Sequence, residues 1–151
     1  MSHKVYFQRP LAPDALLGRV EADGKVYESR FGPDKYVGRV ELDTGKIYEA
    51  RLGPDKYVGQ VMLDSGKVYR HKPMAADEYL GSVDGDGKFF RHRPLAADEY
   101  LGQVVEMTSY AHGGAAFLLL IWPMVEEEME ARERDPEGKE KAEAEEKKAD
   151  P

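Results

Sequence analysis

The sequence predicts an all-β protein in which five β-hairpin repeats close into a flower-like or propeller-like ring, followed by a short apolar helix and a disordered tail. One pattern recurs every 21 residues, with strand starts at Lys4, Lys25, Lys46, Lys67 and Lys88. Apolar and polar residues alternate within each copy, and turn signals separate the alternating segments. A fixed period of this length is the signature of a repeat architecture.

Each copy contains two expected strands joined by a loop of Gly, Pro and Asp residues. In the third copy these strands cover residues 46–51 and 57–62. The stretch GPDKYVG occurs twice, from Gly32 and from Gly53, where a loop leads into a strand. Where this loop is one residue shorter, the next turn is one residue longer, so the copies keep their spacing. We interpret the repetition as a product of turn geometry and packing.

Short turns join one copy to the next. Asp-Gly at 23–24 and at 86–87 is typical of two-residue hairpin turns, in which both residues take positive φ angles. The segments 43–45 and 64–66 fit three-residue turns with a left-handed Gly. The hairpins therefore straddle the copy boundaries.

This arrangement leaves one unpaired strand at each end, residues 4–9 and residues 100–106. Pairing them makes a fifth hairpin and removes the exposed edges that invite aggregation. An open solenoid is the alternative, but it calls for atypical capping copies, and the strands of the first and last copies are ordinary. We therefore expect a closed ring.

Alternation along the second strand of each copy predicts one apolar face and one wet face. Tyr36, Gly38, Val40 and Leu42 are expected to point inward, with Arg39 and Glu41 outward. Glycine is expected where chains approach closely. The predicted interior tiers are Val20, Val40, Val61, Val83 and Val104; Gly18, Gly38, Gly59, Gly81 and Gly102; and Tyr36, Tyr57, Tyr79 and Tyr100, with Leu16 in the tyrosine position of the first copy.

The units G-x-V-x(2-3)-D-x-G-K-[VI]-Y, in a looser form across residues 4–108, resemble the small bacterial proteins described as five-fold beta-flowers. The last unit departs from this pattern with Glu106-Met107-Thr108 in place of the turn. That resemblance implies radiating hairpins and no activity. The repeats resemble MORN modules more weakly, and choline-binding modules poorly, because the single tryptophan, Trp122, lies outside the repeats.

The stretch MTSYAHGGAAFLLLIWPMV, residues 107–125, contains no charged side chain. Its apolar block is shorter than the roughly twenty residues of a spanning helix. We expect residues 115–125 to form a helix that plugs the ring, within a segment covering 109–125. An exposed patch that binds a partner or inserts into a membrane is the alternative. The candidate plug or partner residues are Phe117, Leu118, Leu119, Leu120, Ile121 and Trp122.

Charge and cysteine content narrow the classes of function. Residues 1–108 carry 16 basic and 17 acidic residues, so −6 of the net charge of −7 lies beyond them. The segment 126–151 is expected to be a charged tail, helical at first and disordered after Asp135-Pro136. Nucleic acid is an improbable partner for so acidic a tail. The lack of cysteine rules out a disulfide framework and fits a cytoplasmic protein, and in the absence of a secretory signal pattern we take the cytoplasm as the default location.

Motifs for catalysis or cofactors are absent from the sequence. It contains no phosphate-binding glycine loop, no His-Glu-x-x-His helix and no Gly-x-Ser-x-Gly elbow. DGDGK from Asp84 resembles the opening of a calcium loop but lacks the distal glutamate. His71 and His92 occupy equivalent positions, yet a metal site normally needs a third ligand. We expect no cofactor, no metal and no enzymatic activity.

A basic sector is the remaining candidate site. Copies four, five and one carry basic residues near their loops, whereas copies two and three carry Glu28 and Glu49. Such a sector could attract phosphate groups, anionic lipid, the protein's own acidic tail or a protein partner. Ordinary solvated charge is the simpler interpretation. The residues of the candidate patch are Arg9, Arg70, His71, Lys72, Arg91, His92 and Arg93.

These observations favour a non-enzymatic structural or binding protein, a repeat scaffold for interactions. The alternative is a membrane-peripheral protein anchored through residues 115–125 and the basic sector.

Overall fold

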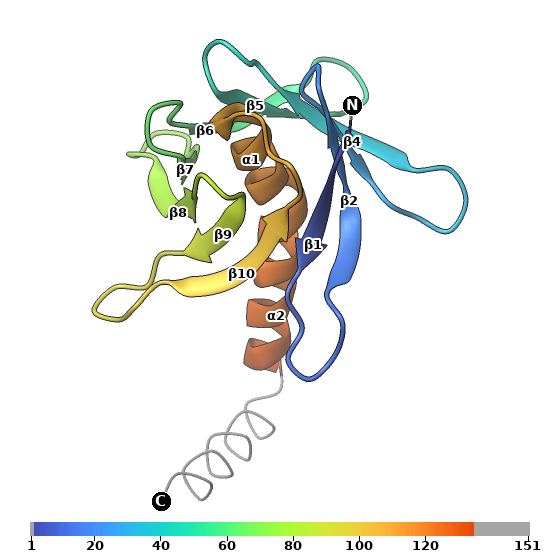
Figure 1. Ribbon diagram of the computed structural model, residues 1–151. Coiled ribbons are helices and arrows are strands. Elements are labelled where there is room, and N and C mark those ends of the chain that lie inside the picture. The colour runs from blue at the N-terminus through green and yellow to red at the C-terminus, as the bar shows by residue number, and fades with distance from the viewer. Residues whose placement is uncertain (1, 135–151) are drawn as a thin grey trace, which may run out of the picture. The chain divides into compact units, whose positions relative to one another are not determined.

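The computed structural model describes residues 2–134, which form ten β-strands followed by helical segments (Figure 1). The described residues divide into two compact units, the first ending at Ile121 and the second beginning at Trp122. The strands are β1 Ser2–Phe7, β2 Ala15–Glu21, β3 Lys25–Glu28, β4 Lys35–Val40, β5 Lys46–Glu49, β6 Lys56–Val61, β7 Lys67–Arg70, β8 Glu78–Val83, β9 Lys88–Arg91 and β10 Glu99–Val104. The helical segments are α1 Tyr110–Ala116, the π-helix η1 Phe117–Ile121 and α2 Trp122–Arg134.

The ten strands form a closed antiparallel barrel, which confirms the predicted closure. β1 pairs with β10 as well as with β2, and it places Val5 opposite Val104 and Phe7 opposite Gly102. The other strands pair with their neighbours along the chain. The open solenoid is therefore excluded. Closure leaves none of the described strands at a sheet edge, where it could pair with another chain.

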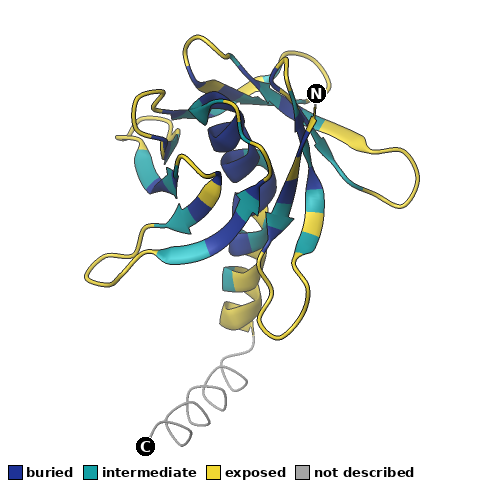
Figure 2. Ribbon diagram, in the orientation of Figure 1, coloured by how far each residue is buried: buried dark blue, intermediate teal, exposed yellow. Residues whose placement is uncertain are grey.

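Apolar side chains from every strand fill the barrel interior. Val20, Val40, Val61, Val83 and Val104 are buried, as the alternation predicts. Buried residues recur along the strands and in α1 and η1, and the exposed residues gather in the loops (Figure 2). Burying each valine contributes about 1.5 kcal/mol or more to stability, so this tier is a main source of the fold's stability. The strands starting at Lys25, Lys46, Lys67 and Lys88 add the buried residues Val26, Ile47, Val68 and Phe89.

A β-bulge recurs at one place in each pair of an odd-numbered strand with the strand that follows it. In β3 and β4, Val26 lies opposite Gly38 but Tyr27 lies opposite Tyr36, so Val37 is the extra residue. The bulge turns Tyr36 to the outer face, where its ring centre lies 5.6 Å from that of Tyr27.

The predicted interior tier of tyrosines is therefore wrong. Tyr36, Tyr57, Tyr79 and Tyr100 each pair with an aromatic ring of the preceding strand, and Leu16 is half-exposed. A two-residue period describes a strand only while its register is unbroken, and a bulge of one residue reverses the faces. Leu42 also differs from the prediction, because it lies in the turn after β4 and is partly exposed.

The turns between copies keep the left-handed glycine but not the predicted two-residue form. Gly24 has a φ of 96° and Gly87 a φ of 82°, whereas the preceding aspartates are not among the residues with positive φ. The N–H of Gly24 donates to the carbonyl of Glu21 at 2.9 Å, which closes a longer turn. The 43–45 and 64–66 turns carry their positive φ at Gly45 and Gly66, as predicted.

α1 and η1 run through the interior of the barrel (Figure 1). The segment begins at Ser109, whose side chain caps α1 by accepting from the N–H of His112. It enters the barrel with small residues, because a Cβ added at Gly114 would lie 2.2 Å from Cβ of Val61. Farther along, a Cβ at Gly59 would lie 2.6 Å from Leu118. Glycines on both sides therefore allow the helix to pack against the strands.

The second unit begins with α2, in which Trp122 and Val125 are buried. Pro123 stands at the second position of α2 and cannot donate a backbone hydrogen bond, and the wider π-helical turn directly before it suits this missing donor. The helix predicted over 115–125 is thus longer at both ends. Residues 126–134 of the predicted tail belong to α2, and residues 135–151 lie outside the described residues.

Candidate functional site

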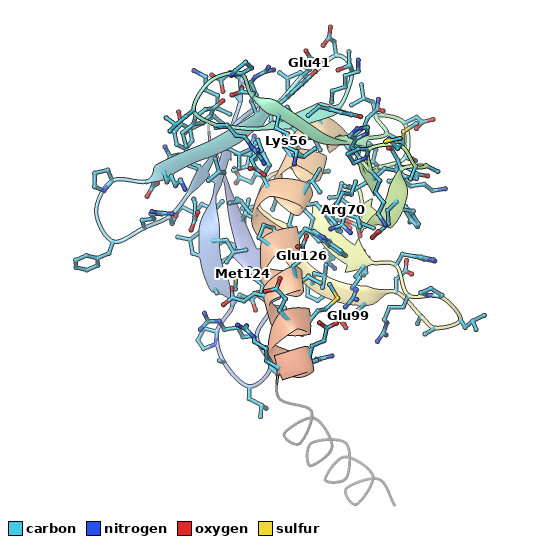
Figure 3. All side chains as sticks on the ribbon, turned by 180° about the vertical axis from the view of Figure 1, so that it is seen from behind. Glu41, Lys56, Arg70, Glu99, Met124 and Glu126 are labelled. Carbon is cyan, nitrogen blue, oxygen red and sulfur yellow. The ribbon has the colours of Figure 1, made fainter. Side chains whose placement is uncertain are left out.

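Five loops, each following an odd-numbered strand, lie at one end of the barrel. They cover residues 8–14, 29–34, 50–55, 71–77 and 92–98, and we call them the rim loops. Because successive strands are antiparallel, these loops share one end and the short turns share the other. The rim loops are largely exposed, and side chains project from them into solvent (Figures 2 and 3).

Each rim loop carries one large apolar side chain that is fully exposed. These five side chains, which we call the tip residues, have relative exposures of 105 to 111 %. Ordinary exposed apolar residues here, such as Leu63 in a turn, are only about 40 % exposed. Full exposure of one large apolar residue on every loop is therefore a feature of the rim, not of the surface in general. The tip residues are Leu11, Phe31, Leu52, Met74 and Leu95.

The backbone presents three of these side chains in a conformation that is unfavourable for them. Leu11, Met74 and Leu95 have φ values of 60°, 61° and 61°. The left-handed region costs a non-glycine residue about 1 to 2 kcal/mol. In the other two loops a glycine takes the positive φ directly after the tip residue, at Gly32 and Gly53. All five loops therefore bend sharply at the tip.

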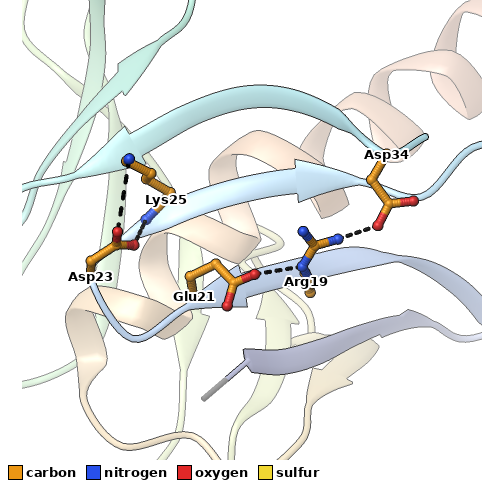
Figure 4. Close-up of polar contacts among 5 residues, drawn as sticks. All are labelled: Arg19, Glu21, Asp23, Lys25 and Asp34. Carbon is orange, nitrogen blue, oxygen red and sulfur yellow. Dashed lines mark hydrogen bonds and ion pairs between the residues drawn. The ribbon is translucent and has the colours of Figure 1, made fainter.

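The outer face behind the loops is held by paired charges and stacked rings. Arg19 lies over the ring of Tyr27 at 4.3 Å, and its Nε donates to Glu21 at 2.6 Å while another nitrogen reaches Asp34 (Figure 4). Arg39 repeats this arrangement with Tyr48 and Asp55. These contacts tie the ends of two of the five rim loops, at Asp34 and Asp55, to the neighbouring strands β2 and β4.

The fourth copy of the predicted basic sector is interleaved with carboxylates. Arg70, on β7, donates through Nη2 to both oxygens of Glu78 at 3.0 and 3.1 Å, and Nζ of Lys72 lies 2.7 Å from the same group. The hydrogen bond from Lys72, followed by that from Arg70, lowers the pKa of Glu78. Nδ1 of His71 lies 3.3 Å from Asp77, and the His71 ring lies tilted beside that of Tyr57, with 4.9 Å between ring centres.

In the fifth copy, too, carboxylates lie beside the basic side chains. Nδ1 of His92 lies 3.7 Å from Asp98, and Arg93 lies 3.8 Å from Glu99. Arg91 lies opposite Glu99 across β9 and β10. Closure brings β1 beside β10, so Arg9 does follow a strand next to the fifth copy, and it is exposed. The structure thus gathers copies four, five and one in one sector, but acidic side chains accompany most of its basic ones.

The candidate plug residues are largely enclosed. Phe117 and Ile121 are fully buried, Leu118 and Leu120 are buried, and Leu119 is intermediate. Phe117 contacts Phe89 of β9 edge to face, with 5.9 Å between ring centres. Trp122, the first residue of α2, is also buried.

A buried histidine pair escaped the sequence analysis. His3 and His112 are buried, and their ring centres lie 5.5 Å apart. Nε2 of His112 lies 2.9 Å from the carbonyl oxygen of Ala22, and Nδ1 lies 2.7 Å from Oγ of Ser109. Since a carbonyl only accepts, Nε2 carries the proton and Nδ1 accepts from the Ser109 hydroxyl. The alternation of His3 with Val5 along β1 was the available signal.

The tip residues were also missed, although their signal is visible in the sequence. One large apolar residue stands at the same place in every loop, among Pro, Gly, Ala and Asp. The sequence analysis attributed the repeated loop residues to turn geometry and packing, and it did not consider the large apolar residue that every loop contains.

Among residues 2–134, no group of three or more His, Cys, Asp or Glu side chains is arranged to hold a metal ion. No helix of this described part is both long enough and apolar enough to cross a membrane. No family model, curated protein or solved structure matches the chain. The proposed function therefore rests on the geometry of the barrel and its rim loops.

Proposed function

We propose that this protein is a non-enzymatic binding scaffold, in which a rigid barrel presents five apolar tips from one rim. The observation that carries the proposal is the full exposure of Leu11, Phe31, Leu52, Met74 and Leu95. Exposed apolar groups of this size are unfavourable in water. Three of them add an unfavourable backbone conformation. Neither feature stabilises the isolated chain, so we assign both to contact with a partner.

The barrel is suited to this role as a five-fold support. We infer that it consists of five hairpin repeats in a flower-like ring, with residues 110–121 as its plug. Strand starts 21 residues apart and the recurring bulge support the repeat. The close fit of Gly114 against Val61 and the burial of Phe117 support the plug.

The membrane-peripheral alternative, with residues 115–125 as the anchor, receives less support. Residues 115–118, 120 and 121 are buried, so they would have to leave the barrel to meet a membrane. Most side chains of the basic sector already face Glu78, Glu99, Asp77 or Asp98. We therefore place the apolar contact at the tip residues.

The proposal of a non-enzymatic role rests on the surroundings of the buried histidines. The contact between Ser109 and His112 has the geometry of a nucleophile and its base. However, Ser109 also caps α1, and the second nitrogen of His112 is committed to the backbone of Ala22. Both contacts are explained by the fold. A cytoplasmic location is part of the same proposal.

Hydrophobic-interaction chromatography tests the scaffold without any assumption about the partner. The chain with all five tip residues changed to Ser should elute from a phenyl resin much earlier than the original chain, with an unchanged thermal midpoint. The matched control is Leu42→Ser with Met62→Ser and Leu63→Ser, which alters partly exposed side chains in the turns. Equal retention of the tip variant and the original chain, or unfolding of the tip variant, would contradict the proposal.

A further inference from the structure

We propose that the five tip residues insert into the interface of a lipid bilayer, as five separate shallow anchors. This inference rests on the proposed function, because it names the partner of the same loops. It follows from three features of the rim loops: the separation of the apolar groups, the balance of charge and the position of proline.

The apolar groups of the rim are single side chains on separate loops. Leu52, for example, stands between Arg51 and Gly53, followed by Pro54 and Asp55, and the tip itself is fully exposed. The core of a protein–protein interface is a continuous buried patch that contains its strongest contacts. A fluid bilayer needs no such continuity, because each side chain finds acyl chains wherever it enters. The dispersed arrangement therefore favours lipid over a folded partner.

Charge on the rim loops is balanced, which points to an uncharged interface. Each loop contains one Lys or Arg and one Asp, so its net charge is zero when histidine is neutral. Several of the basic groups also face carboxylates of flanking strands, as Arg51 faces Glu49 at 3.3 Å and Lys72 faces Glu78 at 2.7 Å. Attraction to anionic headgroups is therefore weak. The apolar tips must provide the binding free energy, and zwitterionic lipid is sufficient.

The basic residue of each loop still has a place at the interface. It precedes the tip by one or two positions, as Arg30 precedes Phe31 and Arg93 precedes Leu95. Long basic side chains keep their charged ends in the headgroup region while their methylene stems lie along apolar surface. This arrangement limits insertion to the tip itself.

Proline stands within two residues of every tip, which suits the backbone to a water-poor environment. A backbone N–H without a partner is costly away from water, and proline has none. Its fixed φ also reduces the conformational entropy that a loop would lose on insertion. The prolines are Pro10, Pro33, Pro54, Pro73 and Pro94.

Flotation with large vesicles tests the inference on the full chain. The probes are phosphatidylcholine alone and phosphatidylcholine mixed with phosphatidylserine, each at low and at high salt. The original chain should float with both, with little effect of salt. Each single tip change to Ser should weaken partitioning by up to about ten-fold, since one buried side chain of this size is worth about that factor. The five-fold variant should stay at the bottom, and the turn control should float.

Three results would overturn the inference. Vesicle binding that requires phosphatidylserine and disappears at high salt would show that charge attraction, not the tip residues, drives it. Vesicle binding that persists when all five tip residues are changed to Ser would show that another surface binds the lipid, such as residues 115–125. Absence of binding, in a chain whose phenyl-resin retention depends on the tips, would leave the scaffold intact and make the partner a protein.

A second measurement reports insertion directly. Leu52→Trp places an indole at a tip, and its emission should shift to shorter wavelength when phosphatidylcholine vesicles are added. The matched control, Leu63→Trp, should show no shift, because it lies in a turn at the other end of the barrel. An unchanged spectrum for Leu52→Trp would contradict insertion.

Discussion

The two buried histidines show how one side chain can be satisfied while its neighbour is not. His112 uses both ring nitrogens, whereas Nδ1 of His3 is buried with no hydrogen-bond partner among the described residues. Nε2 of His3 lies at the long distance of 3.5 Å from Oγ1 of Thr108. Two buried histidine side chains that lie side by side therefore differ in hydrogen bonding: both ring nitrogens of His112 have partners, whereas one ring nitrogen of His3 has none among the described residues.

Changing each histidine to Phe should separate these two cases. His112→Phe leaves the Ser109 hydroxyl and the Ala22 carbonyl without their partner, and should lower the free energy of unfolding by about 2 to 4 kcal/mol. His3→Phe removes a buried polar atom that gains nothing from folding, so its effect should stay within about 1 kcal/mol. Urea denaturation measures both. A larger loss from His3→Phe than from His112→Phe would contradict the assigned hydrogen bonds.

The positive φ at the tip residues predicts opposite effects on stability and on binding. Leu95→Gly relieves a left-handed conformation, and should raise the free energy of unfolding by about 0.5 to 1 kcal/mol. The same change should weaken vesicle binding. Leu52→Gly is the control, since Leu52 is not among the residues with positive φ, and it should weaken binding without stabilising the chain. Urea denaturation and flotation provide the two measurements, and a destabilised Leu95→Gly would argue against the strained tip.

At the scale of the element, the bulge in each strand pair sets the environment of one tyrosine. Tyr36, Tyr57, Tyr79 and Tyr100 occupy equivalent places, and burial raises the pKa of each, with nearby aspartates adding to the effect. The folded chain therefore holds these protons more tightly than the unfolded chain. Stability from this source is complete below the unfolded pKa, near pH 10, and is lost as pH rises above it.

Alkaline unfolding tests this row of tyrosines. The urea midpoint should be steady between about pH 8 and pH 9 and should fall progressively above about pH 10. Tyr57→Phe combined with Tyr79→Phe should reduce that fall, because phenylalanine has no proton to lose. A fall of the same size in the double variant would show that other groups cause the alkaline loss.

The helix inside the barrel packs closely against β6 because Gly114 has no side chain. Gly114→Ala improves helix propensity by about 1 kcal/mol, but its Cβ would lie 2.2 Å from Cβ of Val61. A contact this short forces the helix or β6 to move, and overpacking of this kind costs about 1 to 3 kcal/mol. We expect Gly114→Ala to lower the stability of the chain, as measured by thermal or urea unfolding. Gly85→Ala is the control, because Gly85 is exposed and its nearest neighbour is 3.9 Å away.

At the scale of the whole molecule, the sequence predicted that the first and last strands pair, but it did not predict which residues face inward where the register is shifted by a bulge. Complementary leftover strands at 4–9 and 100–106 predicted closure, and the structure pairs Val5 with Val104. The tyrosine tier was assigned to the wrong face, since the bulge that reverses it leaves no mark in the alternation. The basic sector looked one-sided because the pairing of Arg70 with Glu78 spans two strands.

The plug itself is best tested by shortening the chain. Ending it at Tyr110 removes Phe117, Ile121 and the other buried side chains inside the barrel, and each loss of a large apolar residue costs about 2 to 5 kcal/mol. A single domain is stabilised by only about 5 to 15 kcal/mol, so the shortened chain should not fold.

Thermal unfolding compares the shortened and full chains, both shown to be monodisperse. Adding a peptide of residues 110–134 to the shortened chain should restore part of the transition, because the barrel interior would again be filled. An unchanged midpoint in the shortened chain would mean that the barrel closes without the helix. Residues 115–125 would then be free to bind a membrane. The tip residues would no longer be the favoured apolar contact surface.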